Sequence, residues 1–219
     1  MNRDGFLDYI DIYCERLAPG ILAEPLNALT NAGFFIAAFL VARLASREKA
    51  LDGRALILIG LMLLIGTGSS LFHTLALRWA GMADTLSILC YQIAFLLLYA
   101  RHVMAFTRIG TVLTLAGFCA AIFIAALLPH VTHNVPVSYM PALLFVTGFG
   151  IWHWHNRKRD RGALLGAAAL FTVSLSFRTL DPVLCAHWPL GTHFIWHILN
   201  AGVLYLTTRA YVRNTRSAC

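Results

Sequence analysis

Seven long apolar segments constrain the fold of this chain more than any other feature of its sequence. Each contains about 20 mostly apolar residues, the length at which an α-helix spans the hydrocarbon core of a bilayer. The segments lie near residues 27–45, 55–75, 81–100, 109–128, 136–154, 162–180 and 191–210. The sequence therefore predicts an all-α membrane protein, built as a bundle of seven transmembrane helices.

The composition favours the same fold and excludes several others. Hydrophobic residues make up 59% of the chain and charged residues only 12%, whereas an average soluble domain has about 25% charged residues. These figures exclude a disordered protein, a collagen-like fibre, a disulfide scaffold and a nucleic-acid-binding module. We therefore expect the lipid bilayer as a partner, with no nucleic acid and no obligate protein partner.

The distribution of Lys and Arg predicts the orientation of the helices, because cytoplasmic loops of membrane proteins are enriched in both. The loops and ends on one side of the predicted bundle carry thirteen basic residues, and those on the other side carry four, namely Arg3, Arg16, Arg78 and Arg178. The C-terminus belongs to the basic side. We therefore expect the C-terminus to be cytoplasmic and the N-terminus to lie outside.

This topology divides the chain into three parts. Residues 1–25 interleave acids with apolar side chains, which predicts a short extracytoplasmic or interfacial helix and not a signal peptide. Residues 26–210 form the seven-span bundle, and residues 211–219 form a cytoplasmic tail. Because the loops and tails are short, we expect an integral multi-pass protein of a bacterial inner membrane.

Five polar side chains from three predicted helices lie at a similar depth near the outer side. Ser69 and His73 are four residues apart near the outer end of the second segment, and Asp84 lies near the outer end of the third. His193 and His197 lie in the first turns of the seventh. Residues spaced i, i+4 share one helix face, and ionisable groups inside a bilayer are costly and commonly functional. The pattern indicates a polar site between these helices.

Zinc is the metal that this set of side chains favours. Two imidazoles at i, i+4 can hold one zinc ion, and a third from a facing helix leaves the fourth position open for water. His193 and His197 form such a pair, and His73 supplies the third ligand. For any single histidine near a helix end, the alternative is an ordinary interfacial hydrogen bond. We predict a zinc site toward the extracytoplasmic side.

A series of short motifs makes the sequence similar to the alkaline ceramidases, within the wider CREST group of seven-span membrane hydrolases. The motifs are DIYCE at 11–15, EPLNALTN at 24–31, GTGSSLFHTL at 66–75, Asp84, and GTHFIWH at 191–197. Each is short, but together and in this order they extend over almost the whole chain. The resemblance implies a zinc-dependent amidase that cleaves ceramide to a sphingoid base and a fatty acid.

The resemblance also implies roles for single residues. His73, His193 and His197 correspond to the family's zinc ligands, Ser69 to its active-site serine and Asp84 to its active-site aspartate. We expect Asp84 to take a proton from a zinc-activated water and pass it to the leaving nitrogen, while Ser69 stabilises the oxyanion. Alternatively, Asp84 only orients a ligand histidine, and Ser69 only bonds the carbonyl four residues earlier.

A calcium site near the N-terminus is a further implication of the resemblance. It would use Asp11, Glu15 and Glu24, but Tyr13 replaces the family's tryptophan, and the aspartate lies one position early. The alternative is that Glu24 and Asn27 cap and anchor the first helix.

The predicted topology puts two cysteines, Cys14 and Cys185, on the outer side, where disulfides persist. We therefore expect a disulfide between them, and the resemblance supports the same pairing. The alternative is two unpaired thiols.

Two other functions compete with the hydrolase. Other CREST relatives suggest a seven-span receptor or sensor with a structural zinc and little turnover. A small transporter or proton channel could use Asp84 and the histidines as a relay, but the sequence offers no ionisable stepping stones across the core of the bilayer.

Overall fold

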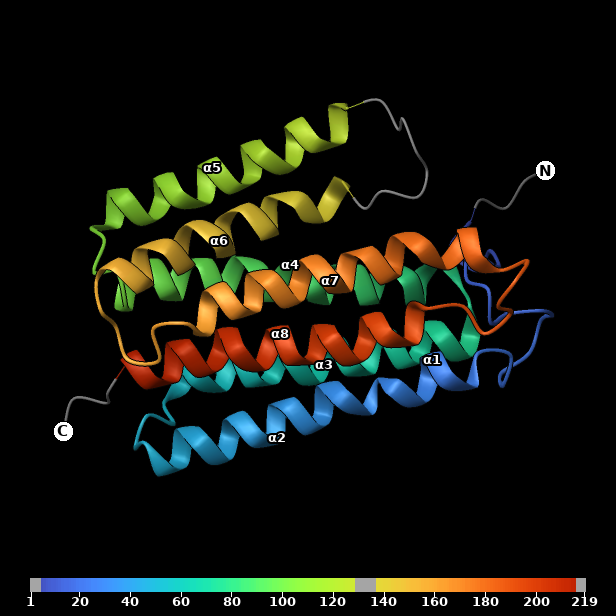
Figure 1. Cartoon of the computed structure of the whole chain (residues 1–219), viewed down its shortest axis with the longest axis horizontal. Helices are drawn as coiled ribbons and strands as arrows, with labels where there is room; N and C mark the ends of the chain where they lie inside the picture. The colour runs from blue at the N-terminus through green and yellow to red at the C-terminus, as the bar shows by residue number, and fades with distance from the viewer. Residues whose placement is uncertain (1–4, 129–136, 216–219) are drawn as a thin grey trace.

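The computed structural model describes residues 5–128 and 137–215, and the regular secondary structure of these ranges is helical (Figure 1). Arg3, Asp4, His130, His133, Arg216 and Cys219 lie outside the described residues. The helices of the described ranges are, in order, α1 (Pro25–Thr30), α2 (Ala32–Arg47), α3 (Gly53–Leu75), α4 (Arg78–His102), α5 (Arg108–Leu127), the 3-10 turn η1 (Val137–Tyr139), α6 (Met140–His155), α7 (Ala163–Leu184) and α8 (His193–Asn214).

Each apolar segment of the sequence corresponds to one helix, except the first, which corresponds to the pair α1 and α2. Five spans are long and apolar enough to cross a membrane: α1 and α2 taken together, α3, α4, α5 and α7. The helix α6 has only 16 residues. The helix α8 is continuous, but polar side chains such as Asn200 and Arg209 interrupt its apolar sequence. The described residues therefore form an all-helical membrane protein with five candidate spans.

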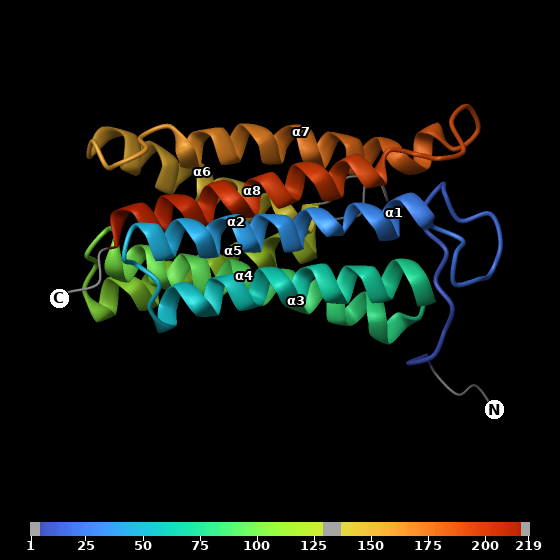
Figure 2. The ribbon, with the colours of Figure 1, turned by 90° about the horizontal axis from the view of Figure 1, so that it is seen from below.

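The long helices run side by side along the long axis of the molecule (Figures 1 and 2). The closest partners are α7 with α8 and α3 with α4, while α2 packs on both α3 and α8. The central core contains large buried side chains such as Phe34, Met62 and Tyr99. Many large apolar side chains, including Ile109 and Phe123, are exposed instead. An exposed apolar surface of this extent suits contact with lipid.

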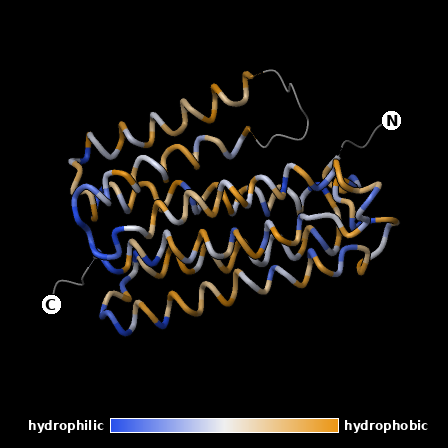
Figure 3. Tube along the Cα trace, in the orientation of Figure 1, coloured by the Kyte–Doolittle hydropathy of each residue, from blue (hydrophilic) through white to orange (hydrophobic). Residues whose placement is uncertain are grey.

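Polar residues gather at the two ends of the bundle, most strongly at the end where α2, α4 and α6 finish (Figure 3). Ion pairs join the turns there: Arg159 lies 3.0 Å from Glu48, and Arg209 lies 2.5 Å from Asp160. The helix α3 starts at the same end, where the Asp52 carboxylate accepts hydrogen bonds from the amides of Arg54 and Ala55. The opposite end holds the N-terminal segment and the start of α8 (Figure 1).

The N-terminal segment from Gly5 to Glu24 contains no helix, so the predicted short helix is wrong for these residues. The segment instead lies across the turn between α3 and α4. Ile10 N donates to Ala76 O at 2.7 Å, and Arg78 N donates to Asp8 O at 2.9 Å. These bonds to a neighbouring turn replace the hydrogen bonds that a helix would make internally.

Candidate metal centre

Three buried histidines converge at the end of the bundle that holds the N-terminal segment. His73 comes from the last turn of α3, and His193 and His197 come from the first two turns of α8. Their exposed fractions are between 0% and 2%. Each offers a ring nitrogen, and these nitrogens lie within 4.8 Å of one another. The geometry can hold one metal ion.

The His73 ring is oriented by a carboxylate. Its Nδ1 lies 2.5 Å from Glu24 Oε2, which also accepts a hydrogen bond from Asn27 Nδ2 at 3.0 Å. Burial raises the pKa of the Glu24 carboxyl, but hydrogen bonds from His73, Asn27 and Arg16 lower it more, and the net pKa is below its ordinary value. An ionised Glu24 accepts the Nδ1 proton of His73. The Nε2 atom then keeps its lone pair, and among the described residues this buried atom has no hydrogen-bond partner.

The His197 ring is oriented by a threonine in the same way. Thr30 Oγ1 lies 3.0 Å from His197 Nδ1 and donates its own proton to Leu26 O at 2.7 Å. Because the hydroxyl proton is used, Thr30 accepts the Nδ1 proton of His197. The Nε2 lone pair of His197 is therefore available to a ligand. A ring nitrogen held by an oxygen acceptor on its far side is the usual arrangement of metal-binding histidines.

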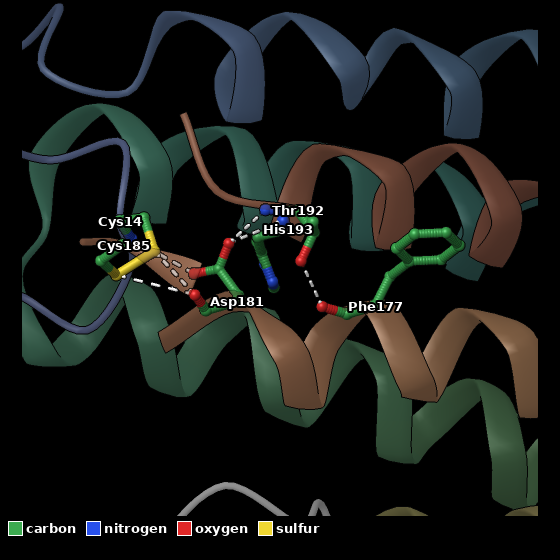
Figure 4. The surroundings of a disulfide bond; sticks show 6 residues. All are labelled: Cys14, Phe177, Asp181, Cys185, Thr192 and His193. Carbon is green, nitrogen blue, oxygen red and sulfur yellow. Dashed lines mark hydrogen bonds between the residues drawn. A yellow bond between two sulfur atoms is a disulfide. The ribbon is translucent and has the colours of Figure 1, made fainter. Parts of the chain in front are cut away.

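His193 is held by its backbone and by an aromatic ring. The Asp181 carboxylate on α7 accepts hydrogen bonds from Thr192 N at 2.6 Å and His193 N at 2.9 Å (Figure 4). Asp181 therefore caps the N-terminus of α8 from another helix. The Tyr13 ring stacks on the imidazole with centroids 3.7 Å apart. His193 Nδ1 is buried, and no described residue offers it a hydrogen bond.

A disulfide joins Cys14 to Cys185 beside this cap (Figure 4). It ties the N-terminal segment to the end of α7, as the sequence analysis expected. Cys14 N also donates to Asp181 Oδ2 at 3.2 Å. Gly191 lies against the same carboxylate with φ +62°, and a Cβ atom there would be 2.1 Å from Asp181 Oδ1. The position therefore requires glycine, both for its backbone conformation and for its lack of a side chain.

Asp84 lines the same cavity as His197, and it lies where α3 and α4 approach closely at Gly68. A Cβ atom on Gly68 would lie 3.1 Å from the backbone N and Cα of Asp84. The Asp84 Oδ1 atom is buried, and within the described ranges it has no hydrogen-bond partner. Ser69 is next to Gly68 and buried as well. Ser70 donates to Gly66 O at 2.7 Å, but the hydrogen bonds of the described residues include none from Ser69 to the carbonyl four residues earlier.

A cavity of about 420 Å³ adjoins this cluster. Its lining includes Ser69, Asp84, His197 and Arg178. A smaller and mostly apolar cavity of about 60 Å³ has four lining residues in common with it, namely Ile65, Ile88, Tyr139 and Asn200. The candidate site therefore opens onto a mostly apolar cavity that carries a few polar side chains, and a second apolar cavity adjoins it between the helices.

The three acids of the predicted calcium site do not converge as one group, although Glu15 and Glu24 both contact Asn27. Glu15 accepts hydrogen bonds from the amides of Leu26 and Asn27 at 2.6 and 2.8 Å, which caps α1. Glu24 makes no side-chain capping bond and binds other side chains instead. Asp11 is exposed. Within the described residues these acids form no group that could hold a metal ion.

Several residues that build the site were missed by the sequence analysis. Thr30, Asp181 and Arg178 received no role, and the contact of Glu24 with His73 was not foreseen. Arg178 lies on the cavity wall, donates to Tyr13 Oη at 3.2 Å and faces the Trp196 ring at 5.3 Å. The sequence carried one usable signal, because Arg178 is a charged residue within the predicted apolar segment 162–180 and Asp181 follows directly after it.

Comparison with known proteins identifies one family. A protein-family model described as Ceramidase matches residues 13–217, which is nearly the whole chain and includes all three histidines, Ser69 and Asp84. No curated protein matches the chain significantly.

Proposed function

The chain belongs to the ceramidase family, and from this membership and the geometry of the three histidines we propose a zinc-dependent amide hydrolase of membrane lipids. The family implies an amide hydrolase that acts on ceramide. The products of that reaction are a sphingoid base and a fatty acid. The observation that carries the proposal is the convergence of three buried ring nitrogens beside a cavity that also contains Ser69 and Asp84.

We further propose that the bundle has seven spans, with the N-terminus outside and the C-terminus in the cytoplasm. The five apolar spans support this proposal, and so does the parallel course of α6 and α8 among them (Figure 1). Arg47, Arg159 and Arg213 lie at the end of the bundle where α2 finishes, which is the more hydrophilic end in Figure 3, and they support the orientation. The histidines then lie toward the extracytoplasmic surface. This depth suits a lipid whose amide lies near the headgroups and whose chains lie in hydrocarbon.

The histidines fit zinc better than a metal that prefers oxygen ligands. All three donors are imidazole nitrogens, and His73 Nε2 is a buried atom that finds no other partner among the described residues. Zinc with three histidine ligands and an open position supplies a Lewis acid and an activated water. Glu24 and Thr30 hold the rings of His73 and His197 with their Nδ1 protons directed away from the metal position.

Asp84 and Ser69 do the remaining chemistry in this proposal. The Asp84 carboxylate accepts a proton from water and returns it to the amide nitrogen as the C–N bond breaks. The Ser69 hydroxyl donates a hydrogen bond to the oxygen that becomes negatively charged in the transition state, a contact commonly worth about 3 kcal/mol. The two cavities give space to the polar end of the lipid and to the start of its acyl chain.

Metal analysis and a hydrolysis assay on the purified protein test this function together. We expect about one zinc per chain, release of fatty acid from ceramide, loss of both on chelation and recovery on addition of zinc. Asp84→Asn is expected to retain zinc and lose activity by about 100-fold or more. The control for Asp84→Asn is Asp8→Asn, at the same end of the bundle. The control for Ser69→Ala is Ser70→Ala, because the Ser70 hydroxyl is hydrogen-bonded to its own helix.

The competing function is a receptor or sensor with a structural zinc. That protein would contain zinc but release no fatty acid from ceramide or from other N-acyl lipids. A chain that hydrolyses ceramide without bound metal would contradict the zinc-dependent proposal.

A further inference from the structure

A buried arginine lies within the acidic N-terminal segment, close to the candidate metal centre. Arg16 is 4% exposed, and all three guanidinium nitrogens donate hydrogen bonds. Nε lies 2.5 Å from Glu24 Oε1, Nη1 lies 3.2 Å from Gly20 O, and Nη2 lies 2.9 Å from His73 O. The guanidinium therefore joins the N-terminal segment to the start of α1 and the end of α3.

Glu24 connects Arg16 to the ring of His73. One carboxylate oxygen faces Arg16, and the other faces His73 Nδ1 at 2.5 Å. Arg16 also binds the backbone carbonyl of His73, so the residue is held at two points, its ring through Glu24 and its backbone directly. A buried carboxylate requires a compensating charge or several donors. Arg16 supplies this positive charge to Glu24, and His73 and Asn27 are the other hydrogen-bond partners of the carboxylate.

This arrangement differs from the calcium site that the sequence resemblance implied. Glu15 is committed to backbone amides and Glu24 to Arg16, His73 and Asn27, while Asp11 is exposed. Calcium binds about six to eight oxygen ligands. The described acids do not provide that set, and a fixed guanidinium already contacts Glu24.

We propose that Arg16 is a positioning residue, an internal cation that holds Glu24 against His73 and directs His73 Nε2 to the metal, so that the site needs no calcium. The inference rests on the proposed zinc site for its effect on metal affinity. Its effect on the His73 ring does not depend on bound metal. Outer-shell partners of metal-binding histidines typically contribute about 10- to 100-fold in metal affinity.

The test compares Arg16→Met with Arg159→Met, which removes an arginine from an exposed ion pair with Glu48 at the other end of the bundle. Zinc affinity is measured by chelator competition in detergent, with and without 1 mM calcium. We expect affinity to fall about 10- to 100-fold in Arg16→Met and to stay within about threefold of wild type in Arg159→Met. Calcium is expected to change neither the affinity nor the thermal midpoint of the wild-type protein.

Two further variants cover a folding defect. Arg16→Lys keeps the charge, but one ammonium cannot replace the planar fork that faces Glu24 and two carbonyls, so we expect an intermediate affinity. Arg16→Met combined with Glu24→Gln removes both charges and leaves no unpaired carboxylate, so we expect it to fold and still to bind zinc more weakly. Wild-type affinity in this double variant, or calcium-dependent zinc binding in the wild-type protein, would overturn the proposal.

Nitrogen NMR of metal-free protein labelled at histidine separates this inference from the hydrolase proposal. We expect His73 to be protonated at Nδ1 in the wild type and to show a mixture of tautomers in Arg16→Met, with His153 unchanged. A protein that binds no zinc would refute the proposed function, yet this tautomer shift would still support the role of Arg16. An unchanged His73 signal in Arg16→Met would contradict it.

Discussion

Buried histidines lie at both ends of the bundle, and they differ in what their ring nitrogens contact. At the end where α2, α4 and α6 finish, called the basic end below, His153 Nδ1 is hydrogen-bonded to the Tyr99 hydroxyl. Its Nε2 lies 3.0 Å from Arg159 O. At the other end, His73 Nε2 and His193 Nδ1 are buried without such partners among the described residues. His153 is as buried as His73. Burial alone therefore does not distinguish a candidate metal site; the convergence of three buried ring nitrogens does.

The largest expected effect on zinc binding comes from replacing one histidine of each kind by alanine. His197→Ala removes a ligand, so zinc affinity should fall by more than the roughly 100-fold limit typical of outer-shell changes, and hydrolysis should fall with it. His153→Ala leaves Tyr99 unpaired and opens a cavity, so it should lower the free energy of unfolding by about 2–4 kcal/mol and keep the zinc.

Zinc content and denaturant unfolding of the two variants check this comparison. Retention of zinc by His197→Ala, or its loss from a folded His153→Ala protein, would remove the distinction between the two ends.

A smaller effect is expected where α3 approaches α4 beside the candidate site. Gly68→Ala would place a Cβ atom 3.1 Å from the Asp84 backbone and separate the helices. The shift required is a few tenths of an ångström, and misplacement of a reacting group by about 1 Å can cost about 100-fold in rate, so hydrolysis should fall by about 10-fold while zinc content stays normal. The control is Gly60→Ala on the same helix, where no atom lies within 4 Å. Equal activities of the two variants would contradict the role of this contact.

The cap of α8 should give a moderate effect on metal binding. One carboxylate oxygen of Asp181 accepts from Thr192 N and His193 N, and the other accepts from Cys14 N, so Asp181→Asn replaces one of these acceptors by an NH2 group that cannot accept. We expect the free energy of unfolding to fall by about 1–3 kcal/mol and zinc affinity to fall about 10-fold, since His193 is then less well held. Chelator competition and thermal unfolding measure the two quantities. A stable variant with wild-type zinc affinity would show that the cap does not position His193.

The smallest effect is expected for a cap at the basic end. Asp52→Ala removes the side-chain acceptor for Arg54 N and Ala55 N, which should cost about 1 kcal/mol of stability and leave zinc and hydrolysis unchanged. Partial burial raises the pKa of Asp52, but hydrogen bonds from Ala55 and Arg54 lower it more. Its ionised form is therefore favoured by folding. The stabilisation should be complete above the ordinary aspartate pKa of about 4 and be lost as the pH falls through the lower folded value.

Thermal unfolding of Asp52→Ala and the wild type at several pH values measures this contribution. A difference between the two proteins that grows as the pH falls would contradict the assigned sign.

The candidate site was predictable to the extent that it depends on local spacing. His193 and His197 share a face because they are four residues apart, as do Ser69 and His73. The contacts that orient these side chains were not predictable in the same way. Thr30 and His197 are 167 positions apart in the sequence, and Glu24 and His73 are 49 apart. A single sequence does not say which faces of two helices meet.

The N-terminal segment shows the opposite outcome. Its alternating acids and apolar residues are typical of an interfacial helix, but the backbone of Tyr9 and Ile10 pairs with the α3–α4 turn instead. Two acids assigned to calcium also serve the fold, Glu15 as the cap of α1 and Glu24 as the partner of Arg16 and His73. Tertiary partners outweighed the local pattern here, because a short isolated helix is only marginally stable.

The sequence by itself determined the apolar helices, their order and the end of the bundle at which these polar side chains gather, because hydrophobic length and helical period are local properties of the chain. Only the tertiary structure decided which ring nitrogens stay free, which acid is neutralised by Arg16, and that Asp84 and Ser69 line one cavity. Those outcomes depend on distances of a few ångströms between helices. Such distances are determined by side-chain packing and by contacts such as that of Gly68 with Asp84.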